Sequence, residues 1–96
     1  MDQVQIIQCI RAHRARLAEL GVSSLSLFGS VARGDATEAS DVDLLVRFEG
    51  RTTFDRYMDL KLFLEDLLGR RVDLVTEQAL REEVRAQVEQ ELLRVA

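Results

Sequence analysis

The sequence predicts a small α/β protein in which three short strands form one sheet and helices pack against it, in the order α-β-α-β-α-β-α. The prediction rests on long segments whose apolar residues recur at helical spacing. These segments alternate with short apolar runs bounded by glycine or polar residues. A chain of 96 residues has room for one hydrophobic core, so we expect a single domain over residues 1–96.

The N-terminal segment predicts a helix from Asp2 to Leu20, followed by a strand. Apolar residues recur along the helix on one broad face: Val4, Ile7, Ile10, Leu17 and Leu20. Asp2 suits the N-cap position, and Gly21 suits the position that follows the last turn. Leucine alternates with serine within Val22–Phe28, which is typical of a strand with one buried face.

A second strand is expected after a short irregular region. Residues Val31–Arg33 predict a turn or a short helix that ends at Gly34, and the small polar residues Asp35–Ser40 predict a loop. The segment Asp41–Phe48 has an apolar centre and predicts the second strand.

The longest helix is expected from Phe54 to Leu68. Thr52 or Thr53 can cap its start, and Gly69 ends it. Its apolar residues cover a wide arc: Phe54, Tyr57, Leu60, Phe63, Leu64, Leu67 and Leu68. Such an arc predicts that the helix packs on the sheet.

The C-terminal segment predicts a short third strand, Val72–Val75, and a final helix, Glu77–Leu93. The helix carries one apolar stripe: Leu80, Val84, Val88 and Leu92. Its acidic residues, Glu82–Glu83 and Glu89–Glu91, are expected to form a solvated face.

The composition excludes several classes of protein. The net charge is −4, which argues against a broad basic surface that grips nucleic acid directly. No apolar run approaches the length that spans a membrane, and the start of the chain has no apolar signal region. The single cysteine, Cys9, fits a reducing compartment, so we expect a cytoplasmic protein. A domain this small also gains stability from a partner, which makes a homo- or hetero-oligomer possible.

The first candidate for chemistry is the pair Asp41 and Asp43. Alternate residues of a strand point to the same face, so the two carboxylates are expected to lie together at the start of the second strand. Mg²⁺ prefers oxygen ligands, usually one or two carboxylates and the oxygens of phosphates. The pair can therefore hold Mg²⁺, although Asp-x-Asp also occurs where aspartates only cap or solubilise a strand.

Gly29, Ser30 and Arg33 form the second candidate, between the first strand and the next turn. Glycine allows a ligand to approach the backbone closely, and a helix start offers free N–H groups to an anion. The planar guanidinium of arginine suits phosphate oxygens. The alternative is a plain strand-to-helix turn with Ser30 as its N-cap and an exposed Arg33.

Asp73 is the third candidate, because it stands inside an otherwise apolar strand. A buried charge without a partner is costly, so an aspartate at this place needs an explanation. Beside Asp41 and Asp43 it would complete a site of three carboxylates. The alternative is an edge strand on which Asp73 faces water.

Taken together, these segments resemble the DNA polymerase β-like nucleotidyltransferase superfamily, in particular its small prokaryotic branch, the minimal nucleotidyltransferase (MNT) proteins. Gly29–Gly34 and Ser40–Leu44 resemble the signature of that branch, and Leu68–Val75 resembles its third-carboxylate strand. The resemblance covers nearly the whole chain.

The resemblance implies the nucleotidyltransferase fold, which has a mixed sheet. Gly29 lies at the end of the first strand and Asp41 at the start of the second. Both can meet one ligand only if these strands are antiparallel. The helix Phe54–Leu68 is long enough for a crossover, which would set the third strand parallel to the second. Asp73 then falls beside Asp41 and Asp43.

The resemblance also implies an activity: a hydroxyl attacks the α-phosphate of ATP, and pyrophosphate leaves. The residues expected to be catalytic and to bind Mg²⁺ are Asp41, Asp43 and Asp73. The residues expected to hold the phosphates of ATP are Gly29, Ser30 and Arg33. Asp73 is also a candidate for deprotonating the attacking hydroxyl.

The partner is implied by the resemblance as well. Proteins of this branch act as antitoxins beside HEPN-domain toxins, which are ribonucleases. We therefore expect transfer of AMP onto a tyrosine of such a toxin, which silences it.

Two alternatives stay open. A nucleotidyltransferase fold could neutralise its partner by contact alone, which predicts that Asp43→Asn leaves neutralisation intact. A purely structural α/β protein with solvated carboxylates predicts no Mg²⁺-dependent binding of ATP.

Overall fold

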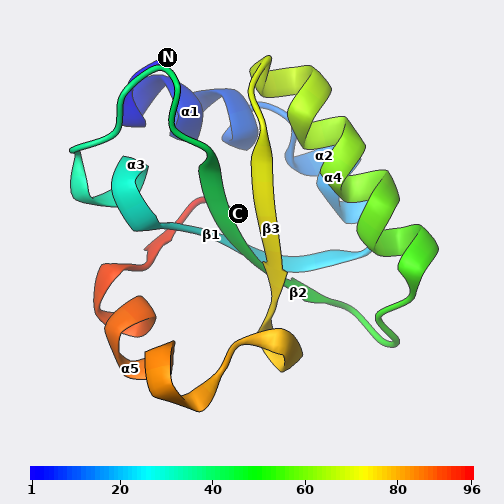
Figure 1. Cartoon of the computed structure of the whole chain (residues 1–96). Helices are drawn as coiled ribbons and strands as arrows, with labels where there is room; N and C mark the ends of the chain where they lie inside the picture. The colour runs from blue at the N-terminus through cyan, green and yellow to red at the C-terminus, as the bar shows by residue number, and fades with distance from the viewer.

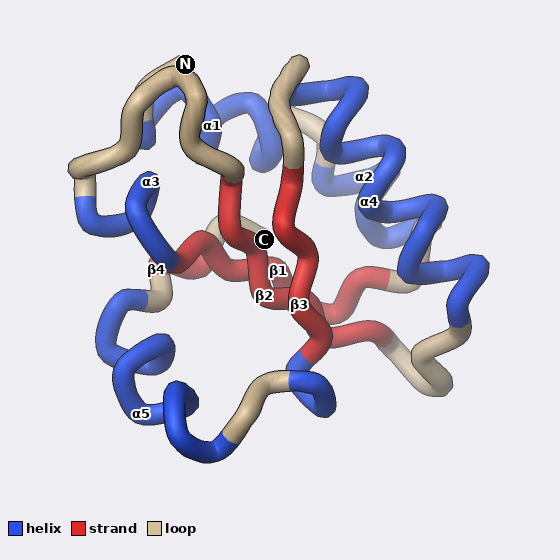
Figure 2. The backbone as a smooth tube through the Cα atoms, in the orientation of Figure 1, coloured by secondary structure: helices blue, strands red, loops and turns tan.

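The computed structural model describes all residues from 1 to 96 and contains a four-stranded sheet in the order β3-β2-β1-β4. Figure 1 shows α5 on one side of the molecule and α1, α2 and α4 gathered on the other. The strands form the centre, and helical segments surround them (Figure 2). The expected α/β fold is confirmed, with one strand more than the sequence predicted. No helix is at once long enough and apolar enough to cross a membrane.

Three strands carry the predicted sheet: β1 (Val22–Phe28), β2 (Val42–Phe48) and β3 (Val72–Thr76). β1 and β2 are antiparallel, whereas β2 and β3 are parallel, so the sheet is mixed as expected. Because α4 joins two parallel strands, it is the crossover helix. The start of β2, the start of β3 and the end of β1 therefore lie at the same end of the sheet.

Alternate residues of the strands face the main core. Along β2 the buried positions are Val42, Leu44, Val46 and Phe48. They pack with buried residues of the helices on that side: Ile6, Ile10, Leu17, Leu60, Leu64 and Leu68. The other face of β2 carries Asp43, Leu45 and Arg47, so the period of two in the strand separates the core from the acidic side chain.

The first predicted helix is divided in two, which corrects the single helix expected over Asp2–Leu20. Helix α1 (Gln3–Arg11) starts with a capping box at Asp2, as expected for that residue. Helix α2 (Arg14–Glu19) follows after a break at His13, whose φ of −115° and ψ of 28° are not helical. The His13 ring contacts the Cys9 carbonyl at 2.9 Å, and both helices still place apolar residues in the core.

Helix α4 (Phe54–Leu68) has the predicted bounds. The Thr53 side chain accepts a hydrogen bond from the Arg56 N–H, so Thr53 is the N-cap of the two threonines considered. Gly69 ends the helix at φ +64°, a conformation that glycine adopts without strain. This turn delivers the chain directly to β3.

The C-terminal segment differs from the predicted helix Glu77–Leu93. It divides into a 3₁₀ turn (Glu77–Ala79), helix α5 (Glu82–Glu91) and strand β4 (Leu93–Arg94), which pairs with β1. Of the predicted apolar stripe, Leu80 and Val88 are buried, whereas Val84 is 41% exposed. Leu80 lies before α5 and Leu92 after it, so the four residues do not form one stripe on a single helix.

Side chains of α4 cover the outer edge of β3. Glu65 accepts a hydrogen bond from the Val72 N–H at 3.0 Å, and Lys61 donates to the Val72 carbonyl oxygen. The Tyr57 hydroxyl donates to the Leu74 carbonyl oxygen at 2.7 Å. Three backbone groups at the outer edge of β3, the Val72 N–H and the Val72 and Leu74 carbonyls, are thereby paired with side chains.

Candidate active site

The three strand ends converge at Asp43. This residue pairs with Phe28 of β1 on one side and with Asp73 of β3 on the other. Paired residues of neighbouring strands place their side chains on the same face, so Asp43 and Asp73 are neighbours on the face away from the main core. Gly29 follows Phe28 directly. The structure thus brings Gly29, Asp43 and Asp73 together, as the sequence predicted.

Asp43 has the most perturbed acidity in this region. Its pKa is raised from 3.8 to about 6, first because the carboxyl group is partly buried. The negative charges of Asp73 and Asp41 raise it further, as does a hydrogen bond between the Asp43 and Asp73 side chains, while Arg33 acts in the opposite direction. The ionised group is therefore held in an unfavourable place, which a bound cation would make favourable.

Asp41 lies immediately before β2, one residue outside the strand that the sequence predicted to begin there. Its side chain is 46% exposed, and its nearest cation is Arg71, whose Nε stands 3.9 Å from Oδ1. Asp73 is also exposed, and it is the second residue of the edge strand β3. Two of the three carboxylates are therefore free to face a ligand from solvent.

Gly29 is required by the position of Asp43. A Cβ added at residue 29 would overlap Oδ2 of Asp43 and lie 2.9 Å from its Cγ. The φ of Gly29 is +73°, which side chains other than glycine rarely adopt. The backbone of the strand-to-helix turn can therefore touch the central carboxylate only because residue 29 has no side chain.

Helix α3 (Gly29–Arg33) begins two residues earlier than the predicted Val31. Its N-cap is Phe28, so Ser30 lies inside the helix and the alternative of Ser30 as a plain N-cap is wrong. Arg33 is the last residue of the helix and is half-exposed. It donates to Asp35 at 3.3 Å and to Glu91 at 3.1 Å, and these hydrogen bonds raise the pKa of Arg33.

Glu91 is the site residue that the sequence did not indicate. The prediction placed it on a solvated acidic face, but its side chain is only 16% exposed. Its carboxylate accepts hydrogen bonds from the Gly29 N–H at 3.2 Å and from Arg33 Nη1 at 3.1 Å. An anionic group of the chain itself thus occupies two of the donors expected to hold phosphate. No sequence pattern distinguishes it from its neighbour Glu89.

A cleft of about 350 Å³ opens beside this cluster, between β3 and α5. Its polar wall consists of Gly29, Arg33, Asp73 and Glu91, and its apolar wall includes Val75, Leu80, Val84 and Val88. Most ligand sites combine an apolar lining with a few convergent polar groups. The cleft therefore gives a ligand access to Asp73 from the α5 side.

The donor set fits a hard cation that also binds substrate. No group of three or more acidic, histidine or cysteine side chains is gathered as a ready metal site. Mg²⁺ commonly uses only one or two carboxylates and takes its remaining ligands from phosphates and water. Burial and the negative charges of Asp73 and Asp41 raise the pKa of Asp43, and a cation bound there would offset both effects. Asp41 and Asp43 suit such an ion, and the three-carboxylate site stays a prediction.

A mixed sheet that brings carboxylates of two strands to a glycine turn defines an α/β domain suited to phosphoryl or nucleotidyl transfer. The chain belongs to the nucleotidyltransferase domain family, which it matches over residues 10–95. It is a nucleotidyltransferase enzyme.

Relatives agree with this assignment. The protein adenylyltransferase MntA of Thermococcus cleftensis is 40% identical over 92 residues, which cover 95% of this chain and 93% of the relative. A solved structure provisionally described as a minimal nucleotidyltransferase is 45% identical, with a TM-score of 0.82, and the match covers 97% of this chain and 95% of the other. The nucleotidyltransferase fold is thereby confirmed.

The same fold occurs in a toxin–antitoxin complex. The structure is that of a tri-AMPylated Shewanella oneidensis HEPN toxin with its MNT antitoxin. Its TM-score is 0.60 at 19% identity, and the match covers 88% of this chain and 70% of the other. At this identity the likeness is one of fold.

Proposed function

We propose that this chain transfers AMP from ATP, in the presence of Mg²⁺, to a hydroxyl group of a partner protein, and that the partner is a HEPN-type toxin silenced by the modification. The observation that carries the proposal is the register that sets Asp43 beside Asp73 and against Gly29. The relative MntA of Thermococcus cleftensis, a protein adenylyltransferase, supports AMP as the transferred group and a protein as its acceptor.

The acidic residues have separate tasks in this proposal. Asp41 and Asp43 hold Mg²⁺, which when bound neutralises charge on the triphosphate and on the transition state. Asp73 faces the cleft, where it orients the acceptor hydroxyl and is the candidate to receive its proton. The hydroxyl oxygen bonds to the α-phosphorus, the bond from phosphorus to the bridging oxygen breaks, and pyrophosphate leaves.

The backbone turn at Gly29 supplies the phosphate contacts. The Gly29 N–H and the Arg33 guanidinium donate to phosphate oxygens once Glu91 has moved away from them. Ser30 is half-buried in the first turn of α3 and is proposed to add a hydroxyl donor. Positioning of the triphosphate and the hydroxyl provides most of the catalysis, because no covalent intermediate is needed.

A tyrosine hydroxyl of the toxin is the acceptor that we propose. The toxin complex with the shared fold contains an AMPylated HEPN toxin, which supports a HEPN toxin as the protein that accepts AMP. The apolar wall of the cleft beside Asp73 suits an aromatic ring. The net charge of −4 disfavours a nucleic-acid acceptor. The single cysteine favours a reducing compartment, and we propose the cytoplasm as the place of action.

The alternative is neutralisation of the toxin by contact alone, through the same fold. Intact-mass spectrometry of the protein encoded beside this chain, after incubation with ATP and Mg²⁺, separates the two. Catalysis predicts an added mass of one or more AMP groups with the wild type, and none with Asp41→Asn/Asp43→Asn.

A matched control replaces two exposed carboxylates of α4, Asp55→Asn/Asp59→Asn, and should modify the toxin as the wild type does. If the partner gains no mass with the wild type and is still neutralised by Asp41→Asn/Asp43→Asn, contact alone explains the neutralisation and the proposed transfer is wrong.

A further inference from the structure

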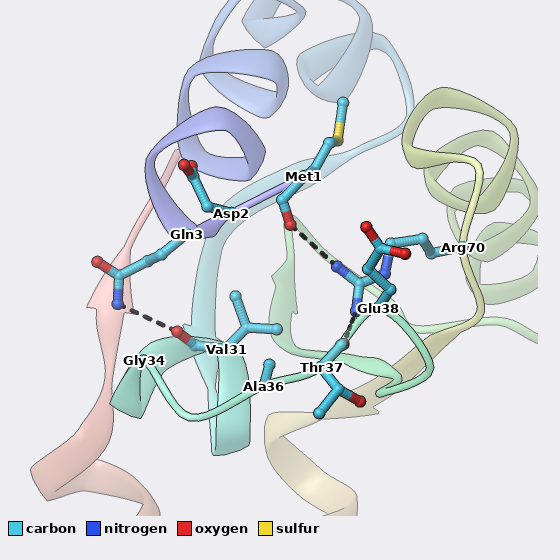
Figure 3. A pocket seen from close by; sticks show the side chains of 9 residues that line it. All are labelled: Met1, Asp2, Gln3, Val31, Gly34, Ala36, Thr37, Glu38 and Arg70. Atoms are coloured by element: carbon cyan, nitrogen blue, oxygen red, sulfur yellow. Dashed lines mark hydrogen bonds between the residues drawn. The ribbon is translucent and has the colours of Figure 1, made fainter.

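Arg70 joins three segments of the chain beside the candidate site. It lies between Gly69, which ends α4, and β3. Its Nη2 donates to the carbonyl oxygens of Thr37 at 3.0 Å and Ser40 at 2.6 Å, and its Nη1 donates to the Met1 carbonyl oxygen at 3.3 Å. Figure 3 shows the guanidinium directed into the pocket between the N-terminus and the loop that precedes β2.

The loop that Arg70 contacts leads directly to the first carboxylate of the site. It is closed on itself by the Ser40 N–H, which donates to the Thr37 carbonyl oxygen at 3.0 Å, and by Ser40 Oγ, which accepts from the Thr37 N–H at 3.0 Å. Both carbonyls that Nη2 contacts belong to this turn. The Ser40 carbonyl is part of the peptide bond to Asp41, so Arg70 fixes the orientation of that peptide.

The same turn after α4 also holds the next residues of β2. The Val42 N–H donates to the Arg71 carbonyl oxygen at 3.0 Å, and two residues later Asp73 enters the site. The Arg71 side chain is 87% exposed, and its Nε is 3.9 Å from Oδ1 of Asp41. An ion pair this exposed and this long does little to orient the Asp41 carboxylate. Arg70 is therefore the main side-chain link between the segment that carries Asp41 and the segment that carries Asp73.

The guanidinium of Arg70 makes three hydrogen bonds to backbone carbonyls but leaves one donor unpaired. Its Nε is buried and has no hydrogen-bond partner. A buried donor without a partner costs free energy, and a smaller side chain at this position would avoid that cost. The fork of the guanidinium reaches two carbonyls at once, which a lysine ammonium cannot do with the same geometry.

We propose that Arg70 is a positioning residue that sets Asp41 relative to Asp73, so that the carboxylates meet the metal ion in the correct geometry. The inference rests on the proposed function, because it assigns Asp41 to the metal ion. Removal of a group that orients a metal ligand without touching the metal typically lowers metal affinity by about 10- to 100-fold.

The first test is hydrogen exchange in the protein without metal or nucleotide. Arg70→Met should speed exchange of the Ser40 and Val42 amides by about 10-fold or more, because the turn loses its external anchor. The matched control is Arg56→Met. Arg56 Nη1 also donates to two loop carbonyls, those of Glu49 at 2.6 Å and Arg51 at 2.8 Å, at a loop outside the site.

The second test is calorimetric titration of Mn²⁺ in the presence of a non-hydrolysable ATP analogue. Arg70→Met should weaken Mn²⁺ binding about 10-fold, and Arg56→Met should leave it unchanged. In the transfer reaction, Arg70→Met should raise the Mg²⁺ concentration for half-maximal rate by a similar factor, while the rate at saturating Mg²⁺ stays close to that of the wild type. Arg70→Lys should show a smaller loss, about 3-fold, and decides the question if Arg70→Met does not fold.

The outcomes separate this inference from the proposed function. Unchanged Mn²⁺ affinity in both Arg70 variants, with a loss of thermal stability like that of Arg56→Met, would show that Arg70 is only structural. A wild type that binds neither Mn²⁺ nor the ATP analogue would refute the proposed function and the metal-positioning role with it. Faster exchange of Ser40 and Val42 alone would then establish a structural anchor and nothing more.

Discussion

The raised pKa of Asp43 predicts that its replacement stabilises the protein. In Asp43→Asn, an amide of nearly the same shape takes the place of a carboxylate that is partly buried and close to Asp73 and Asp41. The amide carries no charge, so the burial and repulsion that raise the pKa no longer oppose folding. The variant should therefore be more stable than the wild type at neutral pH in the absence of metal, although it loses the function of the site.

The magnitude follows from the pKa. A rise from 3.8 to about 6 corresponds to about 3 kcal/mol between the two protonation states if taken in full. Asp43 is partly open to water, and solvent screening reduces such effects strongly, so we expect about 1 kcal/mol. For a domain of this size, 1 kcal/mol raises the melting temperature by about 5 °C.

The pH dependence gives the prediction its sign. The folded protein binds the Asp43 proton more tightly than the unfolded chain does. The ionised carboxylate therefore lowers the free energy of unfolding, and this effect is complete above pH 6. This destabilisation disappears as the pH falls from about 6 towards 3.8. Glu65 and Glu77 have lowered pKa values and act in the opposite direction. The useful quantity is therefore the difference in melting temperature between Asp43→Asn and the wild type.

Thermal unfolding followed by circular dichroism, with chelator present, measures this difference between pH 4 and pH 8. It should be about 5 °C at pH 7.5 and near zero at pH 4. Asp59→Asn, an exposed carboxylate of α4, serves as control and should change little at any pH. A difference that is absent, or that is the same at both ends of the pH range, would refute the reasoning.

Three further predictions concern the site and its supports. Gly29→Ala should cost about 2 kcal/mol and abolish binding of Mg²⁺ and ATP, because its φ is +73° and the new Cβ overlaps Asp43. Glu91→Gln should tighten ATP binding about 5-fold, since the charged competitor for the Gly29 N–H and Arg33 is weakened. Tyr57→Phe should cost about 1 kcal/mol by removing its hydrogen bond to the Leu74 carbonyl, without changing nucleotide affinity.

Each of these has a measurement and a control. Gly50 has φ +72° and open space around it, so Gly50→Ala shares the backbone strain of Gly29→Ala without the clash. Equal effects of the two on ATP binding, measured with a fluorescent ATP analogue, would remove the special role of Gly29. Glu89→Gln should leave the affinity unchanged, and a matching gain would reduce the Glu91 effect to general charge. A weaker ATP affinity in Tyr57→Phe would show that the outer edge of β3, which Tyr57 covers, also affects the nucleotide site.

The sequence predicted the elements that depend on local pattern. Strand periodicity located β1, β2 and β3, and glycines marked the ends of α3 and α4 correctly. The break at His13 was missed because the apolar residues keep their spacing across it. Strand β4 was missed because two residues carry no periodicity, and the strand exists only through pairing with the free edge of β1.

The sequence predicted the site residues that belong to a short recognisable motif. The convergence of Gly29, Asp43 and Asp73 followed from the resemblance and is confirmed in the register of the sheet. Glu91 and Arg70 could not be found in this way. Each is one of several like charges in its segment, and only the tertiary fold selects which one turns inward. The assignment of Mg²⁺ to the carboxylates stays a prediction.

The covered edge of β3 restricts how a protein partner can bind. Extension of the sheet there by β-strand addition would have to displace Lys61, Glu65 and Tyr57, which already pair with the Val72 N–H and with the Val72 and Leu74 carbonyls. At the other end of the sheet, β4 offers only two residues. A partner that binds at the β3 edge would therefore contact the side chains that cover it, so substitutions of Tyr57, Lys61 or Glu65 would change that surface without changing the strand. The same protection limits edge-to-edge aggregation.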